Sequence, residues 1–470
     1  MSEFGKKPKK TVSSIKTGSF ERRLSLTRAG LLASTRMAGH ITAGLFTSKD
    51  KRVEKRKKAL SEQAQFLVHE LGKLKGSVVK IGQVMALYGE HFLPVEVTEA
   101  LHTLEENTVA LEWPIIRGVL YDQLGADRMS QLEVEQAPIG AASLGQVHRA
   151  RIIASDEIIC LKVQYPGVAE AVDADLNAVA QLLKVARVAR LGADFDDWLQ
   201  EVRAMMHREV DYRLEAKTTA HFGQLLANDP RFVVPKVYSE FSSDHVIATR
   251  YEAGEHVSSP RVTALSQSRR SQLAKSALEL FLNELFVWHE IQTDPNFGNY
   301  RIRIAEQGES DQIVLLDFGA VQKYPPSFID PVCSMIVAAF ESDLQQVIAN
   351  GIKLRFMQAD WPPSVLEEFG RVCIAVLEPL AKSQPDVGPE VFNEQGEYRW
   401  AGSDLPARIA KRATVSAINR YFKIPPKEFV FLNRKLVGVY TFISVLQGEF
   451  NGRCLLEPYI DRFVGKSGSE

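Results

Sequence analysis

Two short motifs, one at each end of a predicted β-hairpin, constrain this chain more than any other feature. Asp294 and Asn299 belong to a loop that follows a helical pattern and precedes a short strand-like run from Tyr300 to Ile304. A second such run, Ile313 to Leu316, ends in Asp317-Phe318-Gly319, and the polar residues between the two runs suit a turn. In an antiparallel hairpin the start of the first strand lies beside the end of the second. We therefore expect Asn299 and Asp317 to meet, with Asp294 close behind.

These three side chains carry the oxygen atoms that Mg²⁺ prefers, which are one or two carboxylates together with phosphate oxygens. In kinases the loop aspartate orients the nucleophile, the asparagine five residues later binds Mg²⁺, and the aspartate of D-F-G binds metal. The spacing predicts Asp294 as a catalytic residue and Asn299 and Asp317 as metal ligands. Either motif alone can be an ordinary turn, but their order around one hairpin favours phosphoryl-transfer chemistry.

A nucleotide site of this kind also needs a cation for the phosphates and an acid to position it. Lys162 belongs to the strand-like run Ile158 to Gln164, whose alternation directs its side chain off the sheet, and it resembles the V-A-I-K lysine of kinases. The alternative is an exposed lysine on an edge strand. A helix predicted from about Trp198 to Leu226 carries three acids that can reach this lysine: Glu209, Asp211 and Glu215.

The predicted phosphate loop is one hairpin earlier and contains Gly140, Ala141, Ala142 and Ser143. It differs from G-x-G-x-x-G. Small residues still let backbone N–H groups approach a phosphate, although alanine has less φ freedom than glycine. A tight turn without a ligand is the alternative interpretation.

Length and composition predict a large, globular protein, and the strand-like and helical patterns predict that it is α+β. The chain has 470 residues, and this length is too great for one ordinary core. Of these residues, 45% are hydrophobic and 24% are charged, which is typical of a globular protein. Strand-like and helical patterns predict four segments. These are a basic, partly disordered arm with a membrane-contacting helix (1–60), a helical extension (61–130), a lobe with an antiparallel sheet (131–254) and a helical lobe (255–470).

The N-terminal segment concentrates positive charge, while the formal net charge of the whole chain is only −1. Such an arm can meet anionic lipid or nucleic acid, or simply stay solvated, and we favour lipid and expect no nucleic-acid partner. The four cysteines form no C-x-x-C pair, which favours a reducing compartment. With neither a transmembrane segment nor a signal peptide in the sequence, we expect a cytoplasmic protein, peripheral to a membrane at most.

A helix is predicted from Ser61, because apolar residues recur at spacings of three and four up to Met85. Lys80 and Gln83 lie on roughly the opposite side of this helix. A simple account leaves that second side exposed to solvent.

Together, these residues resemble the UbiB/AarF family of atypical kinase-like proteins, which is associated with coenzyme Q and other isoprenoid lipids. The resemblance covers residues from about 60 to 330. It includes Lys80-Ile81-Gly82-Gln83, similar to the family's K-x-G-Q, the loop from Gly140 to Ser143, similar to its Ala-rich A-A-A-S, and Lys162 within L-K-V-Q-Y-P-G-V. It continues through Glu209-Val210-Asp211, Glu215-Ala216, Gln292 to Asn299, and Asp317-Phe318-Gly319.

The resemblance implies a two-lobed, protein-kinase-like fold with an N-terminal helical extension, and ATP or ADP with Mg²⁺ as cofactors. It implies that Lys80 and Gln83 fold over the active site toward Glu209 and Asp211, and that Glu215 is the partner of Lys162. Together with the Ala-rich loop, these residues would line the nucleotide site and restrict peptide access.

The implied activity is that of an atypical kinase or ATPase that supports ubiquinone-type lipid metabolism. Phosphorylation of separate proteins is disfavoured. The implied partners are isoprenoid lipids, anionic membrane surfaces and lipid-biosynthesis enzymes. Gly140 departs from the family's first alanine, Phe297 replaces a common tryptophan, and the hydrophobic C-terminal anchor of some bacterial members is missing from this sequence.

Two other function classes share parts of this pattern. A non-catalytic module gated by nucleotide would bind lipid or act as a scaffold without consuming ATP. A small-molecule kinase of the type that phosphorylates aminoglycosides or choline would share the metal loop, but K-x-G-Q argues against it.

Overall fold

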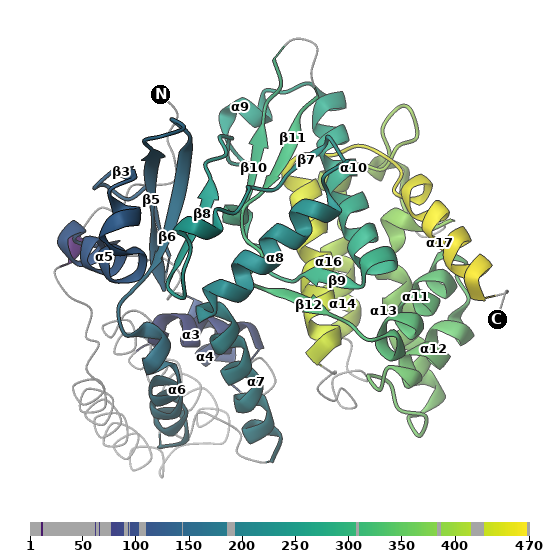
Figure 1. The fold of residues 1–470 in the computed structure, drawn as a ribbon. Coiled ribbons are helices and arrows are strands. Elements are labelled where there is room, and N and C mark those ends of the chain that lie inside the picture. The colour runs from purple at the N-terminus through teal and green to yellow at the C-terminus, as the bar shows by residue number, and fades with distance from the viewer. Residues whose placement is uncertain are drawn as a thin grey trace. The chain divides into compact units, whose positions relative to one another are not determined.

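Buried hydrophobic residues collect into two separate cores, one for each of two units. Figure 1 labels the helices and strands of the chain. The first unit contains residues 1–220 and 236–251, and the second contains residues 221–235 and 252–470. The structure is a computed structural model. It describes residues 11–12, 62, 65, 77–88, 93, 95–102, 110–142, 144–185, 193–306, 310–382, 387–414 and 427–467.

The first unit is built around a five-stranded sheet in which β3, β5, β6 and β8 follow one another and β4 also pairs with β5. All of these pairings are antiparallel. The strands are β3 (Leu132–Val134), β4 (Gly140–Ala141), β5 (Gly145–Ile152), β6 (Ile158–Gln164) and β8 (Val246–Arg250), and a short parallel pair joins β1 (Thr11–Val12) to β2 (Ala110–Leu111).

The alternating pattern of β6 explains its position in the sheet. Ile159, Leu161 and Val163 are fully buried, while Lys162 between them points to the other face, as the two-residue period of a strand requires. The helices of this unit are α3 (Ser77–Tyr88), α4 (Val95–His102), α5 (Trp113–Met129), α6 (Val168–Val185) and α7 (Ala193–Val210), with the 3₁₀ turn η2 (Ser239–Phe241).

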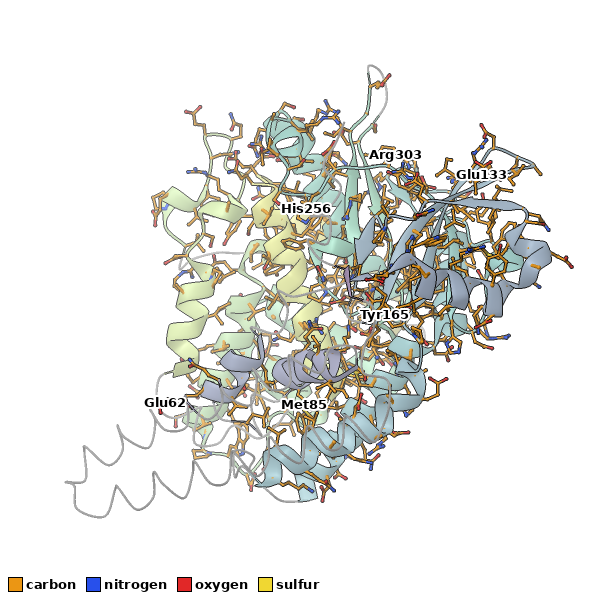
Figure 2. All side chains as sticks on the ribbon, turned by 90° about the vertical axis from the view of Figure 1, so that its left-hand side faces the viewer. Glu62, Met85, Glu133, Tyr165, His256 and Arg303 are labelled. Atoms are coloured by element: carbon orange, nitrogen blue, oxygen red, sulfur yellow. The ribbon has the colours of Figure 1, made fainter. Side chains whose placement is uncertain are left out.

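Helix α3 contacts α6 and α7 through the apolar stripe predicted from the sequence. Val78, Ile81 and Met85 are buried, and Figure 2 labels Met85 on this helix. The earlier turns of the predicted helix are outside the described residues, except for Glu62 and Gln65.

The second unit consists mainly of helices around two small sheets. Strand β10 pairs antiparallel with β11, which pairs parallel with β7, and β12 pairs antiparallel with β9. The strands are β7 (Phe232–Val233), β9 (Glu290–Gln292), β10 (Tyr300–Arg303), β11 (Gln312–Leu315) and β12 (Val321–Lys323). The long helices are α10 (Gln267–Asn283), α11 (Pro326–Phe340), α12 (Leu344–Lys353), α13 (Pro363–Val376), α14 (Leu405–Thr414), α16 (Lys427–Val445) and α17 (Arg453–Ser467). The short helices and turns are α9 (Pro260–Thr263), the π-helical turn η3 (Glu284–Trp288), and the 3₁₀ turns η4 (Phe297–Asn299), η5 (Glu378–Leu380), η6 (Pro389–Val391) and η7 (Trp400–Gly402).

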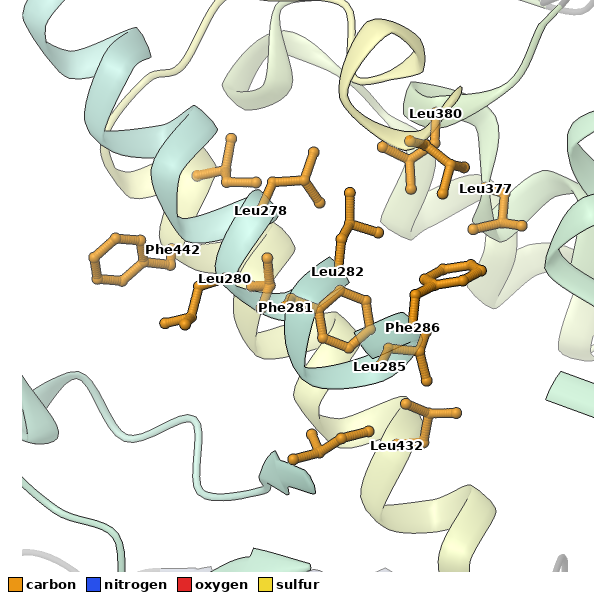
Figure 3. Close-up of a cluster of buried hydrophobic side chains, with 14 of the residues drawn as sticks. Leu278, Leu280, Phe281, Leu282, Leu285, Phe286, Leu377, Leu380, Leu432 and Phe442 are labelled. Carbon is orange, nitrogen blue, oxygen red and sulfur yellow. The ribbon is translucent and has the colours of Figure 1, made fainter. Parts of the chain in front are cut away.

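Helices α10 and α16 form the centre of the second core (Figure 3). Leu432 and Phe442 of α16 belong to the same buried cluster as Phe281 and Leu285. The mixture of antiparallel sheet and helices predicted from the sequence is confirmed.

The single helix predicted from about Trp198 to Leu226 is wrong at one point. The chain forms α7 and then α8 (Tyr212–Leu225), with a break at Asp211. The Asp211 carboxylate accepts a hydrogen bond from the backbone N–H of Leu214 over 2.9 Å, which is the capping interaction that starts a new helix.

Among the helices of the described chain, none combines the length and apolar character that a membrane span needs.

Candidate functional site

The loop from Asp294 to Asn299 is tied at both ends to the chain segment around Asp317. Strand β10 begins directly after the loop and pairs with β11, and the backbone N–H of Leu316 donates to the carbonyl oxygen of Asn299 over 2.9 Å. Strand β9, before the loop, pairs with β12, which follows Asp317. The hairpin therefore brings Asn299 and Asp317 together as the sequence predicts, and the β9–β12 pairing adds a second connection that the sequence analysis missed.

The buried side chain of Gln292 links the two motifs directly. Its amide nitrogen donates to the carbonyl oxygen of Asp317 over 2.6 Å, and its amide oxygen accepts from the backbone N–H of Asp294 over 2.9 Å. The next residue, Thr293, donates to the carbonyl oxygen of Ala320 through both its hydroxyl group and its backbone N–H, over 2.7 and 3.1 Å. These bonds fix the backbone on which Asp294 is carried.

The Asp294 carboxylate accepts a hydrogen bond at each oxygen. The amide nitrogen of Asn299 donates to Oδ2 over 2.9 Å, and the guanidinium of Arg434 donates to Oδ1 over 3.0 Å. Because Asn299 uses its nitrogen here, its carbonyl oxygen is the atom suited to a metal. Arg434 belongs to α16 and was not identified from the sequence.

Asp317 starts a tight turn. Its Oδ1 accepts a hydrogen bond from the backbone N–H of Gly319 over 2.8 Å. Phe318 between them is buried, and its ring lies against that of Phe222, with 4.8 Å between centroids. The buried ring anchors the turn, so the position of the carboxylate is set by the core of the second unit.

In the first unit, Lys162 forms an ion pair with Glu215. Its ammonium donates to the two carboxylate oxygens over 2.7 and 2.9 Å, the pairing that the resemblance implies. Glu215 belongs to the first turn of α8 and is only 7% exposed, and the lysine nitrogen also lies 5.1 Å from the ring centroid of Tyr212. A buried carboxylate of this kind holds the lysine in a defined direction from its strand.

The predicted phosphate loop is a turn between β4 and β5. Gly140 and Ala141 pair with β5, and the backbone N–H of Ala142 donates to the carbonyl oxygen of Gly145 over 2.8 Å. A Cβ at Gly140 would have no atom within 4 Å, whereas one at Gly145 would lie 2.6 Å from the carbonyl oxygen of Val163. The glycine that the backbone requires is thus Gly145, which the sequence analysis did not single out. Ser143 is outside the described residues.

The K-x-G-Q helix connects to α7 through an ion pair. The ammonium of Lys80 lies 2.8 Å from the carboxylate of Glu209, as the resemblance implies, and Lys80 and Gln83 are both half-buried. At Lys80 the second side of this helix therefore contacts protein. This contact contradicts the simple account in which that side is exposed to solvent. Asp211 is the capping residue of α8 described above.

The donor atoms of the second unit suit Mg²⁺ bound with phosphate. Asp317 offers a carboxylate and Asn299 a carbonyl oxygen, and Mg²⁺ takes its remaining ligands from phosphate and water. Within the described residues no group of three or more His, Cys, Asp or Glu side chains forms a self-sufficient metal site. A cavity of about 20 Å³, lined among others by Pro295, Tyr300 and Lys435, lies beside the loop, and this volume holds a single water rather than a nucleotide.

Comparison with known proteins identifies the family. Residues 103–350, just over half of the chain, match the ABC1 atypical kinase-like domain. The chain is 28% identical over 401 residues to atypical kinase COQ8 of Schizosaccharomyces pombe, covering 85% of this chain and 63% of that protein. It is 30% identical over 396 residues to COQ8B of Danio rerio, covering 84% of this chain and 60% of the relative. It is also 30% identical over 376 residues to COQ8 of Saccharomyces cerevisiae, covering 80% of this chain and 71% of the relative.

The chain thus spans somewhat less than two thirds of the length of the S. pombe and D. rerio relatives. A solved structure, the complex of Rv3197 with erythromycin from Mycobacterium tuberculosis, matches 88% of this chain and 98% of its own, with a TM-score of 0.59 and 25% sequence identity. The family match and the solved structure both agree with the kinase-like fold predicted from the sequence. The chain belongs to the ABC1 family of atypical kinase-like proteins, the UbiB and COQ8 group.

Proposed function

We propose that this protein binds Mg-ATP and acts as an atypical kinase or ATPase that supports isoprenoid-lipid metabolism of the ubiquinone type. The observation that carries the proposal is the placement of Asp294, Asn299 and Asp317 on two strand pairs that lock their loops together. The relatives named atypical kinase COQ8 support the same chemistry.

Each residue has a defined role in this proposal. Asn299 and Asp317 hold Mg²⁺, which when bound neutralises charge on the phosphate oxygens. Lys162, held by Glu215, donates to the phosphates, and the small residues from Gly140 to Ser143 let the backbone of this turn approach them. Asp294 orients the hydrogen of the acceptor, which is water or a hydroxyl group.

The remaining expectations from the sequence belong to the same proposal. Lys80, Gln83, Glu209 and Asp211 restrict the nucleotide site so that a peptide acceptor is disfavoured. The basic arm (1–60), the extension (61–130) and the two lobes (131–254 and 255–470) are proposed as functional segments. The arm contacts anionic lipid, and isoprenoid lipids and lipid-biosynthesis enzymes are the proposed partners.

The test compares ATP turnover by the parent and by Asp317→Asn, with neutral and with anionic lipid vesicles. Loss of one metal ligand is expected to slow turnover by on the order of 10³-fold, or ~4 kcal/mol. Asp360→Asn, an exposed carboxylate of the same unit, is the matched control and should match the parent. Equal turnover by Asp317→Asn and the parent would remove the metal assignment.

One observation favours a second function, that of a module that binds nucleotide without consuming it. Both oxygens of Asp294 already accept hydrogen bonds, from Asn299 and Arg434, which leaves fewer lone pairs for the hydrogen of an acceptor. Tight Mg-ATP binding with no hydrolysis under any lipid condition would select this alternative. Detectable turnover that depends on Asp294 would exclude it.

A further inference from the structure

Helix α16 makes direct contact, through one face, with the loop of residues 292–299 that is proposed as the catalytic loop. Arg434 donates to Asp294 over 3.0 Å. One turn later, Gly438 lies so close to the loop that a Cβ there would be 2.2 Å from the Cβ of Pro295. Residues four apart share a helix face, so Arg434 and Gly438 lie on the same face of α16, and this face packs against the loop.

Lys435, the residue after Arg434, is linked to the start of the same loop through Glu284. Lys435 forms an ion pair with Glu284 over 2.7 Å, and both side chains are almost completely buried. The other oxygen of Glu284 accepts from the backbone N–H of Gln292 over 3.3 Å. Helix α16 therefore contacts the loop directly at Asp294 and Pro295, and is linked to Gln292 through Glu284.

The position of α16 is itself set by the core. Leu432 and Phe442, on either side of the contact, are buried in the cluster built on α10 (Figure 3). A helix anchored at both ends can present Arg434 at a fixed place, which a flexible surface side chain cannot do.

The loop carries no cation of its own, since Gln292 to Asn299 contains no lysine or arginine. The cation that donates to Asp294 is 140 positions later in the chain, outside the matched family domain at residues 103–350. We propose that Arg434 is a positioning residue, which acts with Asn299 to hold the plane of the Asp294 carboxylate toward the acceptor. This inference rests on the proposed function of Asp294. Each carboxylate oxygen has a second lone pair, so Asp294 still accepts the hydrogen of the acceptor while Arg434 is bound.

The experiment is a double-mutant cycle on the full chain. The kcat and the KM for ATP are measured for the parent, Arg434→Ala, Asp294→Asn and the double variant, together with Mg-ATP affinity and the midpoint of thermal unfolding. Arg371→Ala is the matched control, because Arg371 forms an exposed ion pair with Glu367 at 3.7 Å in the same unit. Arg434→Lys keeps the charge but loses the planar fork.

Arg434→Ala is expected to lower kcat by on the order of 10- to 100-fold, with little change in KM for ATP, because a displaced catalytic group costs rate rather than binding. In the Asp294→Asn background the same change should cost less than about twofold, since its target is already gone. Arg434→Lys should recover part of the loss, and Arg371→Ala should match the parent.

Two outcomes separate the inference from the function on which it rests. If Asp294→Asn is slow but Arg434→Ala resembles Arg371→Ala, raises kcat, or costs the same factor in both backgrounds, the inference is wrong and the proposed function stands. If Asp294→Asn turns over ATP as fast as the parent, the role of Asp294 is wrong and the inference fails with it.

Discussion

The two loops assigned to the nucleotide are supported very differently. The catalytic loop of the second unit is held by two strand pairs, by the buried Gln292 and by helix α16. The loop from Gly140 to Ala142 in the first unit has one strand partner, and Gly140 has open space around the position of a Cβ.

This difference matches what each loop is proposed to do. A carboxylate that orients an acceptor, or a ligand that holds a metal, loses rate when displaced by as little as about 1 Å. Backbone N–H groups that approach a phosphate can follow its position by small changes in φ and ψ. We therefore expect substitutions behind the catalytic loop to lower stability strongly. Substitutions in the Gly140 turn should leave stability nearly unchanged unless the new side chain clashes with the sheet.

The largest effect on stability is expected from Lys435→Met, which removes one partner of the buried ion pair behind the catalytic loop. Glu284 then remains buried at 1% exposure without its cation, which costs ~3–5 kcal/mol in the free energy of unfolding. Denaturant unfolding measures this loss. Lys382→Met is the control, because the ion pair of Lys382 with Glu341 is exposed on both sides, at 50% and 47% of the two side chains, and its loss should cost less than ~1 kcal/mol.

The cost of Lys435→Met should also depend on pH. Burial raises the pKa of Glu284, against the charge of Lys435 that lowers it, so removing the lysine raises that pKa further. A carboxyl group whose pKa is raised by folding favours the folded state at low pH and loses that contribution as the pH rises. The deficit should therefore shrink when unfolding is measured toward about pH 4, and a deficit that is constant with pH would contradict this account of the pair.

An intermediate effect is expected from Gly145→Ala at the end of the Gly140 turn. The new methyl group would meet the carbonyl oxygen of Val163 at 2.6 Å and the hydroxyl of Tyr212 at 2.7 Å, and such overpacking costs ~1–3 kcal/mol. Thermal unfolding of Gly145→Ala beside Gly118→Ala, which adds a methyl group with no atom within 4 Å, gives the comparison. Equal unfolding temperatures for both variants would show that the sheet accommodates the methyl group.

The smallest effect is expected from Gly140→Ala. With no atom within 4 Å of the added Cβ, the free energy of unfolding should stay unchanged or rise by up to ~0.5 kcal/mol, because alanine restricts the unfolded chain. Measured beside Gly145→Ala, this variant sharpens the distinction between the two glycines of one turn. A loss of stability as large as that of Gly145→Ala would show that the turn is as tightly held as the catalytic loop.

The sequence could predict contacts that follow from strand topology, and it missed those that depend on distant packing. Asn299 and Asp317 meet because the start of one strand of an antiparallel hairpin lies beside the end of the next, and the observed register pairs Tyr300 with Leu315. Strands β9 and β12 have only three residues each, too few for a periodic pattern to show. Asp211 did carry a signal, since aspartate commonly caps a helix, but the apolar pattern on either side concealed the break.

The partners of the site residues were harder to predict than their positions. Sequence reasoning left three acids as candidates for Lys162, and only the family resemblance selected Glu215. Arg434 offered no signal, because it is 140 residues from Asp294 and belongs to no recognised motif. The packing of α16, which the sequence does not reveal, places it beside the loop.

The central claim, an Mg-nucleotide site that uses Asn299 and Asp317, is tested most directly by calorimetric titration of ATP with and without Mg²⁺. We expect the parent to bind ATP at least about 10-fold more tightly with Mg²⁺, the equivalent of ~1.4 kcal/mol, and Asn299→Ala combined with Asp317→Asn to abolish this dependence. Equal affinity for ATP with and without Mg²⁺ in the parent, or an Mg²⁺ dependence that survives both substitutions, would contradict it.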